Sequence, residues 1–235
     1  MAEAAGPNTY GPGEWAERLG WTYGLIAPDN VERGAALVRL DEVRAEAQKA
    51  HAEYNEYWIQ ASRSDAETLF RAPEVLAARA RADDVESRCL PEALWLTRPA
   101  DDIRTCPQLS FALLFLEWEA RYPEEWTEHA KAWGTKQSLI RSVAVSGHSE
   151  AVTEKLIDLV ELVVQRAYRC KDREYVRVAR AVDGDELRTR LNWARHSHNP
   201  WSQLHAGYVL WLLDRPEVPN TLHVWRTWLA DTRTG

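Results

Sequence analysis

The stretch Cys106–Tyr122, with the sequence CPQLSFALLFLEWEARY, decides the fold. Between Leu109 and Leu116 only Ser110 is polar, and a helix that is apolar on nearly every side must be covered on most sides. The stretch is too short to cross a bilayer, which needs about 20 apolar residues. The sequence therefore predicts a buried central helix near residues 108–122, with other helices packed around it.

Further helices are predicted on both sides of this segment. Asp29 followed by Glu32 forms a capping-box pattern, and apolar or small residues at alternating four- and three-residue steps indicate a long acidic helix over residues 29–62. Proline followed by Glu or Gln marks more helix starts, because proline suits the first turn and an acid there agrees with the helix dipole. These prolines are Pro73, Pro91, Pro107 and Pro123. Asn220 is the expected cap of a final helix.

The pattern as a whole predicts an all-α protein. No stretch shows the alternation of a strand with hairpin turns, and the helical segments add up to about eleven, in an irregular multi-helix array or bundle. Residues 1–13 are rich in Gly, Pro and Asn and are expected to form a flexible N-terminal arm. Residues 14–235 are expected to form a single all-helical domain, in which a sub-boundary could fall near residues 134–149.

Composition restricts the class of function. The chain of 235 residues has a formal net charge of −7, so it has no general basic field that attracts nucleic acid. Its three cysteines, Cys89, Cys106 and Cys170, are isolated, which favours reduced thiols in a cytosol over a disulfide framework. The first residues lack the features of a secretory signal. We therefore expect a cytoplasmic protein whose partners are neither RNA nor a membrane.

Glu117, on the central helix, is the first candidate for chemistry. A carboxylate held against a packed core can act as a tuned acid. The alternative is that Glu117 pairs with Arg121 one turn later, while Glu119 lies near the helix end in water. Glu125 and His129 could share one helix face, but the Glu-x-x-His pairs of dimetal bundles are missing from the sequence. We predict neither a metal nor a cofactor.

Histidines gather in the most basic part of the chain, around residues 188–205. The run Arg190-Leu-Asn-Trp-Ala-Arg-His196 resembles the Arg-x(4–6)-His signature of HEPN ribonucleases. The resemblance covers seven residues, and it implies a small helical protein in which Arg190 and His196 act on the RNA phosphodiester. The alternative is that Arg190 pairs with a carboxylate of its own helix, Asp185 or Glu186.

Tryptophan is unusually abundant, with 12 residues. Its side chains can line a pocket for an aromatic, cationic or isoprenoid ligand or face a protein partner, because tryptophan is enriched at interface hot spots. The commonest use of tryptophan is nevertheless in a core. The candidates for ligand or partner binding are Trp118, Trp193, Trp201, Trp211, Trp225 and Trp228, together with His198 and His205.

The sequence favours binding over catalysis, because helices are abundant and no complete catalytic constellation occurs. The leading hypothesis is a regulatory protein that presents a Trp-rich groove to a protein or peptide partner. The alternative is an enzyme with a pocket between helices. That enzyme would be an HEPN-like ribonuclease at Arg190 and His196, or it would use Glu117 in a Trp-lined pocket for a small hydrophobic or aromatic ligand.

Overall fold

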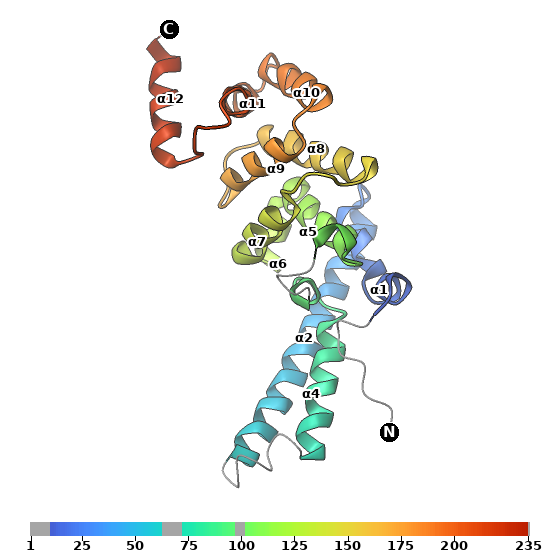
Figure 1. Cartoon of the computed structure of the whole chain (residues 1–235). Helices are drawn as coiled ribbons and strands as arrows, with labels where there is room; N and C mark the ends of the chain where they lie inside the picture. The colour runs from blue at the N-terminus through green and yellow to red at the C-terminus, as the bar shows by residue number, and fades with distance from the viewer. Residues whose placement is uncertain (1–9, 63–71, 97–101, 235) are drawn as a thin grey trace. The chain divides into compact units, whose positions relative to one another are not determined.

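The computed structural model describes residues 10–62, 72–96 and 102–234. Within these ranges it contains eleven α-helices, four 3₁₀ helices and no strand, which confirms the predicted all-α class and helix number (Figure 1). The chain divides into two compact units, residues 1–131 and 132–235. The division falls just before residues 134–149, where the sequence places a sub-boundary. Residues 1–9, most of the predicted arm, lie outside the described residues.

The N-terminal unit contains five α-helices among its described residues. These are α1 (Pro12–Leu19), α2 (Asn30–Ser62), α4 (Pro73–Glu86), α5 (Leu109–Arg121) and α6 (Pro123–His129), with the 3₁₀ helices η2 (Gly20–Ile26), η3 (Glu92–Leu96) and η4 (Ile103–Thr105) between them. The helix predicted after Pro91 is thus the short 3₁₀ helix η3. The prolines at residues 73 and 123 each occupy the first turn of an α-helix, as predicted.

Helix α5 is the buried helix that the sequence predicts. Every residue from Leu109 to Ala120 is buried except Ser110. The buried set includes Glu119, whose exposed fraction is 0%, so the expectation that this carboxylate lies in water is wrong. The chain turns at Tyr122, the cap residue between α5 and α6, and α6 then packs against α5. Helix α5 is therefore buried as far as Ala120, and Arg121 at its end is exposed.

Helix α2 packs along α4 (Figure 1). The Asp29 carboxylate accepts hydrogen bonds from the backbone N–H groups of residues 31 and 32, at 2.9 and 2.8 Å, which confirms the predicted cap. The predicted apolar face is buried from Ala36 to Ala50. Ala47 and Ala50 contribute to a small cluster with Ala82 and Val85 of α4. Small side chains on this face let the two helix backbones approach closely.

The C-terminal unit contains α7 (Trp133–Val143), α8 (Glu150–Val164), η5 (Asp172–Glu174), α9 (Tyr175–Ala181), α10 (Asp185–Arg195), α11 (Pro200–Leu213) and α12 (Leu222–Thr234). Helix α10 packs against α11, both contact α8, and α9 contacts α7, α8 and α11. Figure 1 draws these helices in yellow-green to red. None of the described helices in either unit has the length and apolar character needed to cross a membrane.

The burial of α5 leads to a prediction that uses two leucines of the N-terminal unit. Leu116 in α5 is 0% exposed, whereas Leu76 in α4 is 49% exposed. Leu116→Ala should lower the free energy of unfolding by about 2–5 kcal/mol, because it removes buried methyl groups and leaves a cavity. Leu76→Ala should change it by less than about 0.5 kcal/mol. Urea unfolding followed by circular dichroism measures both, and equal effects would contradict the buried position of α5.

Candidate functional site

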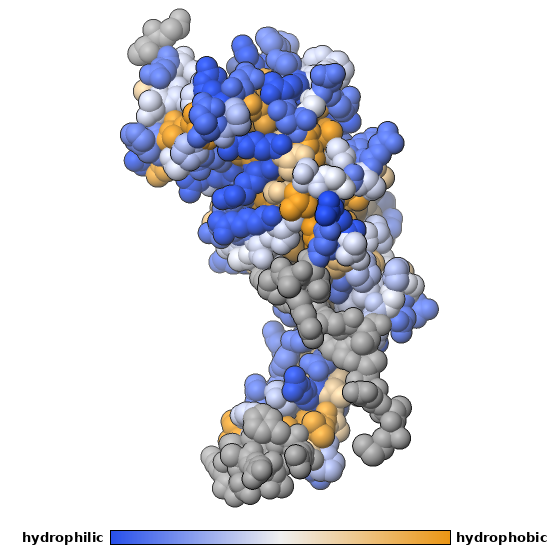
Figure 2. Space-filling model, viewed as in Figure 1, coloured by the Kyte–Doolittle hydropathy of each residue, from blue (hydrophilic) through white to orange (hydrophobic). Residues whose placement is uncertain are grey.

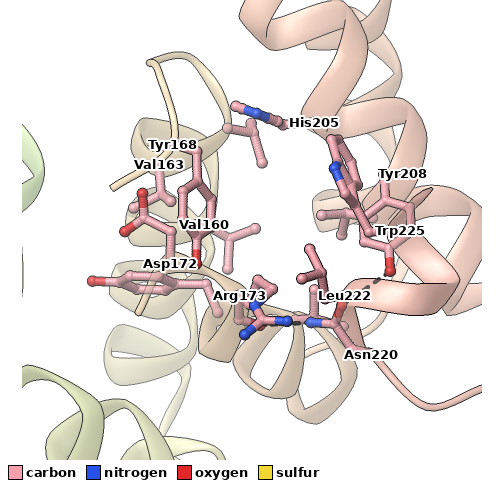
Figure 3. Close-up of a pocket in the computed structure, with 14 residues that line it drawn as sticks. Val160, Val163, Tyr168, Asp172, Arg173, His205, Tyr208, Asn220, Leu222 and Trp225 are labelled. Atoms are coloured by element: carbon pink, nitrogen blue, oxygen red, sulfur yellow. Dashed lines mark hydrogen bonds between the residues drawn. The ribbon is translucent and has the colours of Figure 1, made fainter. Parts of the chain in front are cut away.

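A cavity of about 370 Å³ lies within the C-terminal unit, bordered by α8, η5, α9, α11 and α12 (Figure 3). Cavities of about 300–1,000 Å³ with mostly apolar walls and a few polar groups are typical of binding sites. This cavity has that character. Its lining side chains are valines, aromatic rings and a small number of polar groups.

Valines form the apolar wall of the cavity. Helix α8 supplies Val160, Val163 and Val164, helix α9 supplies Val176, and helix α11 supplies Val209. All five are buried, with exposed fractions of 1–7%. Because valine is β-branched and restricted in its first side-chain torsion, these side chains form a wall whose shape varies little.

His205 and Tyr208 of α11 and Trp225 of α12 form the aromatic wall of the cavity. They belong to a larger aromatic cluster that also contains Trp201 and Trp211 of α11 and Trp228 of α12. The ring of Tyr208 meets Trp225 edge-on, with centroids 4.7 Å apart, and lies 5.1 Å from the ring of Trp228. Trp201 stacks on His205 at 5.8 Å. These separations fall in the range in which aromatic pairs attract one another. The cluster therefore joins α12 to α11 through side chains.

Asn220 fixes the linker that leads into α12. Its amide nitrogen donates to the backbone carbonyl of Arg173 at 2.7 Å, and its amide oxygen accepts from the Tyr208 hydroxyl at 3.0 Å (Figure 3). The cap of α12 is instead Thr221, whose hydroxyl accepts from the N–H of Val224 at 3.2 Å. The prediction that Asn220 caps this helix is wrong, because its amide groups are used between elements.

Asp172 is a buried carboxylate at the border of the cavity. It accepts from the Lys136 ammonium at 2.6 Å, the Arg166 guanidinium at 3.0 Å and the backbone N–H of Arg169 at 2.7 Å. The Lys136 side chain is 0% exposed and that of Asp172 5%. Burying a charge is costly unless it is paired and hydrogen-bonded, and these contacts meet that requirement.

Burial shifts the pKa values of the two titratable groups on the aromatic wall, His205 and Tyr208. Burial lowers the pKa of His205 below its ordinary value, against opposing effects from backbone groups of Val164 and from the charge of Asp172. Burial raises the pKa of the Tyr208 hydroxyl. Both shifts favour the uncharged side chain near neutral pH, so this wall presents apolar ring surface to an occupant.

The structure brings together most of the predicted binding residues. Trp201, His205, Trp211, Trp225 and Trp228 all belong to the aromatic cluster. Sequence analysis missed Tyr208, although it lies three residues after His205 and three before Trp211 and so shares their helix face. It also missed the valines, because a cavity wall and a packed core have the same apolar periodicity.

Three predicted binding residues lie elsewhere. Trp118 is 0% exposed in α5 of the N-terminal unit, where it contacts Phe115. Trp193 is 72% exposed on α10. His198 is exposed in the segment between α10 and α11. None of the three lines the cavity.

The residues predicted for catalysis are engaged in local contacts. Arg190 binds Asp158 at 2.6 Å, Glu161 at 3.2 Å and, as the alternative predicted, Glu186 at 2.7 Å. Hydrogen bonding to Glu186 and the two other carboxylates holds the pKa of this guanidinium above its ordinary value. A phosphodiester approaching Arg190 would meet three negative charges, which oppose it. This surrounding favours a structural role for Arg190.

His196 and Glu117 also make contacts with residues one helical turn away. The exposed His196 ring contacts the backbone carbonyl of Asn192 at 2.7 Å through Nδ1. The Glu117 carboxylate accepts a hydrogen bond from the Arg121 guanidinium at 2.6 Å, which confirms the predicted ion pair. Across the described ranges, no group of three or more His, Cys, Asp or Glu side chains is arranged to hold a metal ion.

No protein family, curated protein or solved structure gives a significant match to this chain. The functional proposal therefore depends on the cavity and the residues around it.

Glu174, next to Asp172 and Arg173, fastens this border of the cavity to α7. Its carboxylate accepts from the Arg141 guanidinium at 2.7 and 3.0 Å, from the Gln137 amide at 2.8 Å and from Arg177 at 2.9 Å. Hydrogen bonding to Arg141 is the largest favourable cause that lowers the pKa of Glu174 from 4.5 to about 2, against the opposing effect of burial.

These contacts predict a pH dependence of stability. A carboxylate with a lowered pKa in the folded state stabilises the protein above its ordinary pKa, and that contribution is lost as the pH falls through the folded value. Between pH 4.5 and about 2, Glu174→Gln should therefore lose less unfolding free energy than the wild type. Urea unfolding across this pH range measures the difference. Glu217→Gln, an exposed control, should follow the wild type, and identical pH slopes for both variants would contradict the prediction.

Proposed function

We propose that the C-terminal unit is a binding module that takes up an apolar side chain of a peptide partner in its cavity. The observation that carries the proposal is the cavity itself, which has a volume of about 370 Å³ and is lined by five valines and by the rings of His205, Tyr208 and Trp225. Such a space suits a single large aliphatic or aromatic side chain. The polar groups at its border would orient the peptide rather than react with it.

A peptide is favoured by apolar side chains at the surface around the cavity. Tyr168 and Leu222 line it and are 52% and 47% exposed, and Trp201, which stacks on the lining residue His205, is 46% exposed. Two other residues of this unit, Trp193 and Val145, are exposed outside the cavity, and Figure 2 shows hydrophobic patches among the hydrophilic side chains of its visible face. Exposed apolar residues grouped at one place are typical of interaction sites. An occupant that extends beyond the cavity would cover them.

The expected affinity of a short peptide is modest. An aromatic side chain buries about 150–250 Å², which at about 25 cal/mol per Å² contributes about 4–6 kcal/mol before the costs of association. Those costs include the ordering of the peptide and of exposed side chains such as Trp201. Because these costs offset much of that contribution, we expect a dissociation constant above about 1 mM for one anchor residue, and tighter binding for a whole partner.

The proposal predicts that binding depends on the anchor. The blocked peptide Ac-Ala-Gln-Trp-Gln-Ala-NH2 should shift the methyl NMR signals of Val163, Val176 and Val209, and Ac-Ala-Gln-Ala-Gln-Ala-NH2 should not. Val163→Phe should weaken binding of the first peptide at least about tenfold, because the new ring occupies the cavity. Val145→Phe is the matched control, since Val145 is 38% exposed in the same unit and does not line the cavity.

A second pair of variants tests the aromatic wall. Trp225→Ala removes a lining ring and should weaken binding of the Trp peptide, whereas Trp193→Ala removes an exposed ring outside the cavity and should have no effect. If the Trp peptide leaves the cavity valines unshifted, or if Val163→Phe binds it as well as the wild type does, the peptide proposal is wrong.

A further inference from the structure

The border of the cavity at η5 carries a local excess of positive charge in a chain whose net charge is −7. Residues 166–180 contain two acids, Asp172 and Glu174, and six basic residues: Arg166, Arg169, Lys171, Arg173, Arg177 and Arg180. Both acids are also bound by basic residues of α7, at 2.6 Å from Lys136 and 2.7 Å from Arg141. The negative charges of this segment are therefore compensated from outside it.

Arg173 differs from the other polar residues that line the cavity. Asp172 is bound by Lys136 and Arg166, and both ends of the Asn220 amide are used. The Arg173 side chain is exposed and lines the cavity beside Asn220 and Leu222 (Figure 3). Within the part of the chain that the structure describes, no carboxylate lies at salt-bridge distance from its guanidinium.

We propose that the peptide partner is acidic, with a carboxylate next to its apolar anchor that binds Arg173. This inference rests on the proposed function, because Arg173 can meet such a carboxylate only if the anchor occupies the cavity. A guanidinium presents donors that match a carboxylate with two parallel hydrogen bonds. The surrounding positive segment attracts an acidic peptide before contact and disfavours a basic one.

The contact should add selectivity more than affinity. Arg173 is exposed, and ion pairs in contact with water contribute little, with strong screening by salt. The acidic peptide Ac-Ala-Glu-Trp-Glu-Ala-NH2 should therefore bind the wild type about fivefold more tightly at low salt than its Gln counterpart. This preference should shrink as the salt concentration rises.

The experiment titrates the full chain with the Glu and Gln peptides and follows the cavity methyl signals by NMR. Arg173→Gln should lose the preference for the Glu peptide while binding the Gln peptide as the wild type does, which also shows that the variant is folded. Arg177→Gln is the matched control. Arg177 lies in the same segment and is 64% exposed, but it does not line the cavity, so this variant should keep the preference.

The outcomes separate the two proposals. Equal affinity of the wild type for both peptides would overturn the role of the carboxylate and leave the cavity proposal standing. If Arg173→Gln still prefers the Glu peptide, this inference is also overturned, because the preference would then come from the other basic residues of the segment 166–180. If neither peptide shifts the cavity methyl signals, the proposed function fails and this inference fails with it.

Discussion

The C-terminal unit depends on how one buried carboxylate is compensated. The charge of Asp172 is tolerable inside the protein only because an ammonium, a guanidinium and a backbone N–H converge on it. These donors come from Lys136 in α7 and from Arg166 and Arg169 in the segment after α8. The same carboxylate therefore brings three parts of the chain to one point. It also fixes η5, and with it the position of Arg173 at the border of the cavity.

Helix α12 is held differently from the other walls of the cavity. Its contacts with α11 are made by rings, with Trp225 and Trp228 against Tyr208, and its linker is fixed by the amide of Asn220. Most of its remaining residues are exposed. Elements with few buried contacts open at low free-energy cost. An occupant that touched Trp225 would add contacts to α12, which has few buried contacts of its own. Binding in the cavity would therefore stabilise the packing of α12 against α11.

The sequence predicts what local patterns determine. The apolar run of α5, the Asp29 cap and the helix starts at Pro73 and Pro123 all follow from periodicity and helix-start signals. The end of α8 does not follow from such patterns. Apolar or small residues at helical spacing continue from Val163 through Ala167 to Cys170, but the helix ends at Val164. The turn that follows is closed by the Asp172 carboxylate, which accepts a hydrogen bond from the backbone N–H of Arg169 at 2.7 Å. A competing side-chain hydrogen bond of this kind becomes predictable only when its other partners are known.

The cavity could not be predicted from the sequence. A tryptophan in the core, such as Trp118, and a tryptophan that lines the cavity, such as Trp225, look the same in composition and periodicity. Burial moves the pKa of His205 down and that of Tyr208 up. The Asp172 carboxylate forms ion pairs with Lys136 and Arg166. The groups around the cavity thus supply shape, ring surface and the exposed guanidinium of Arg173, and the proposed binding function rests on these three features.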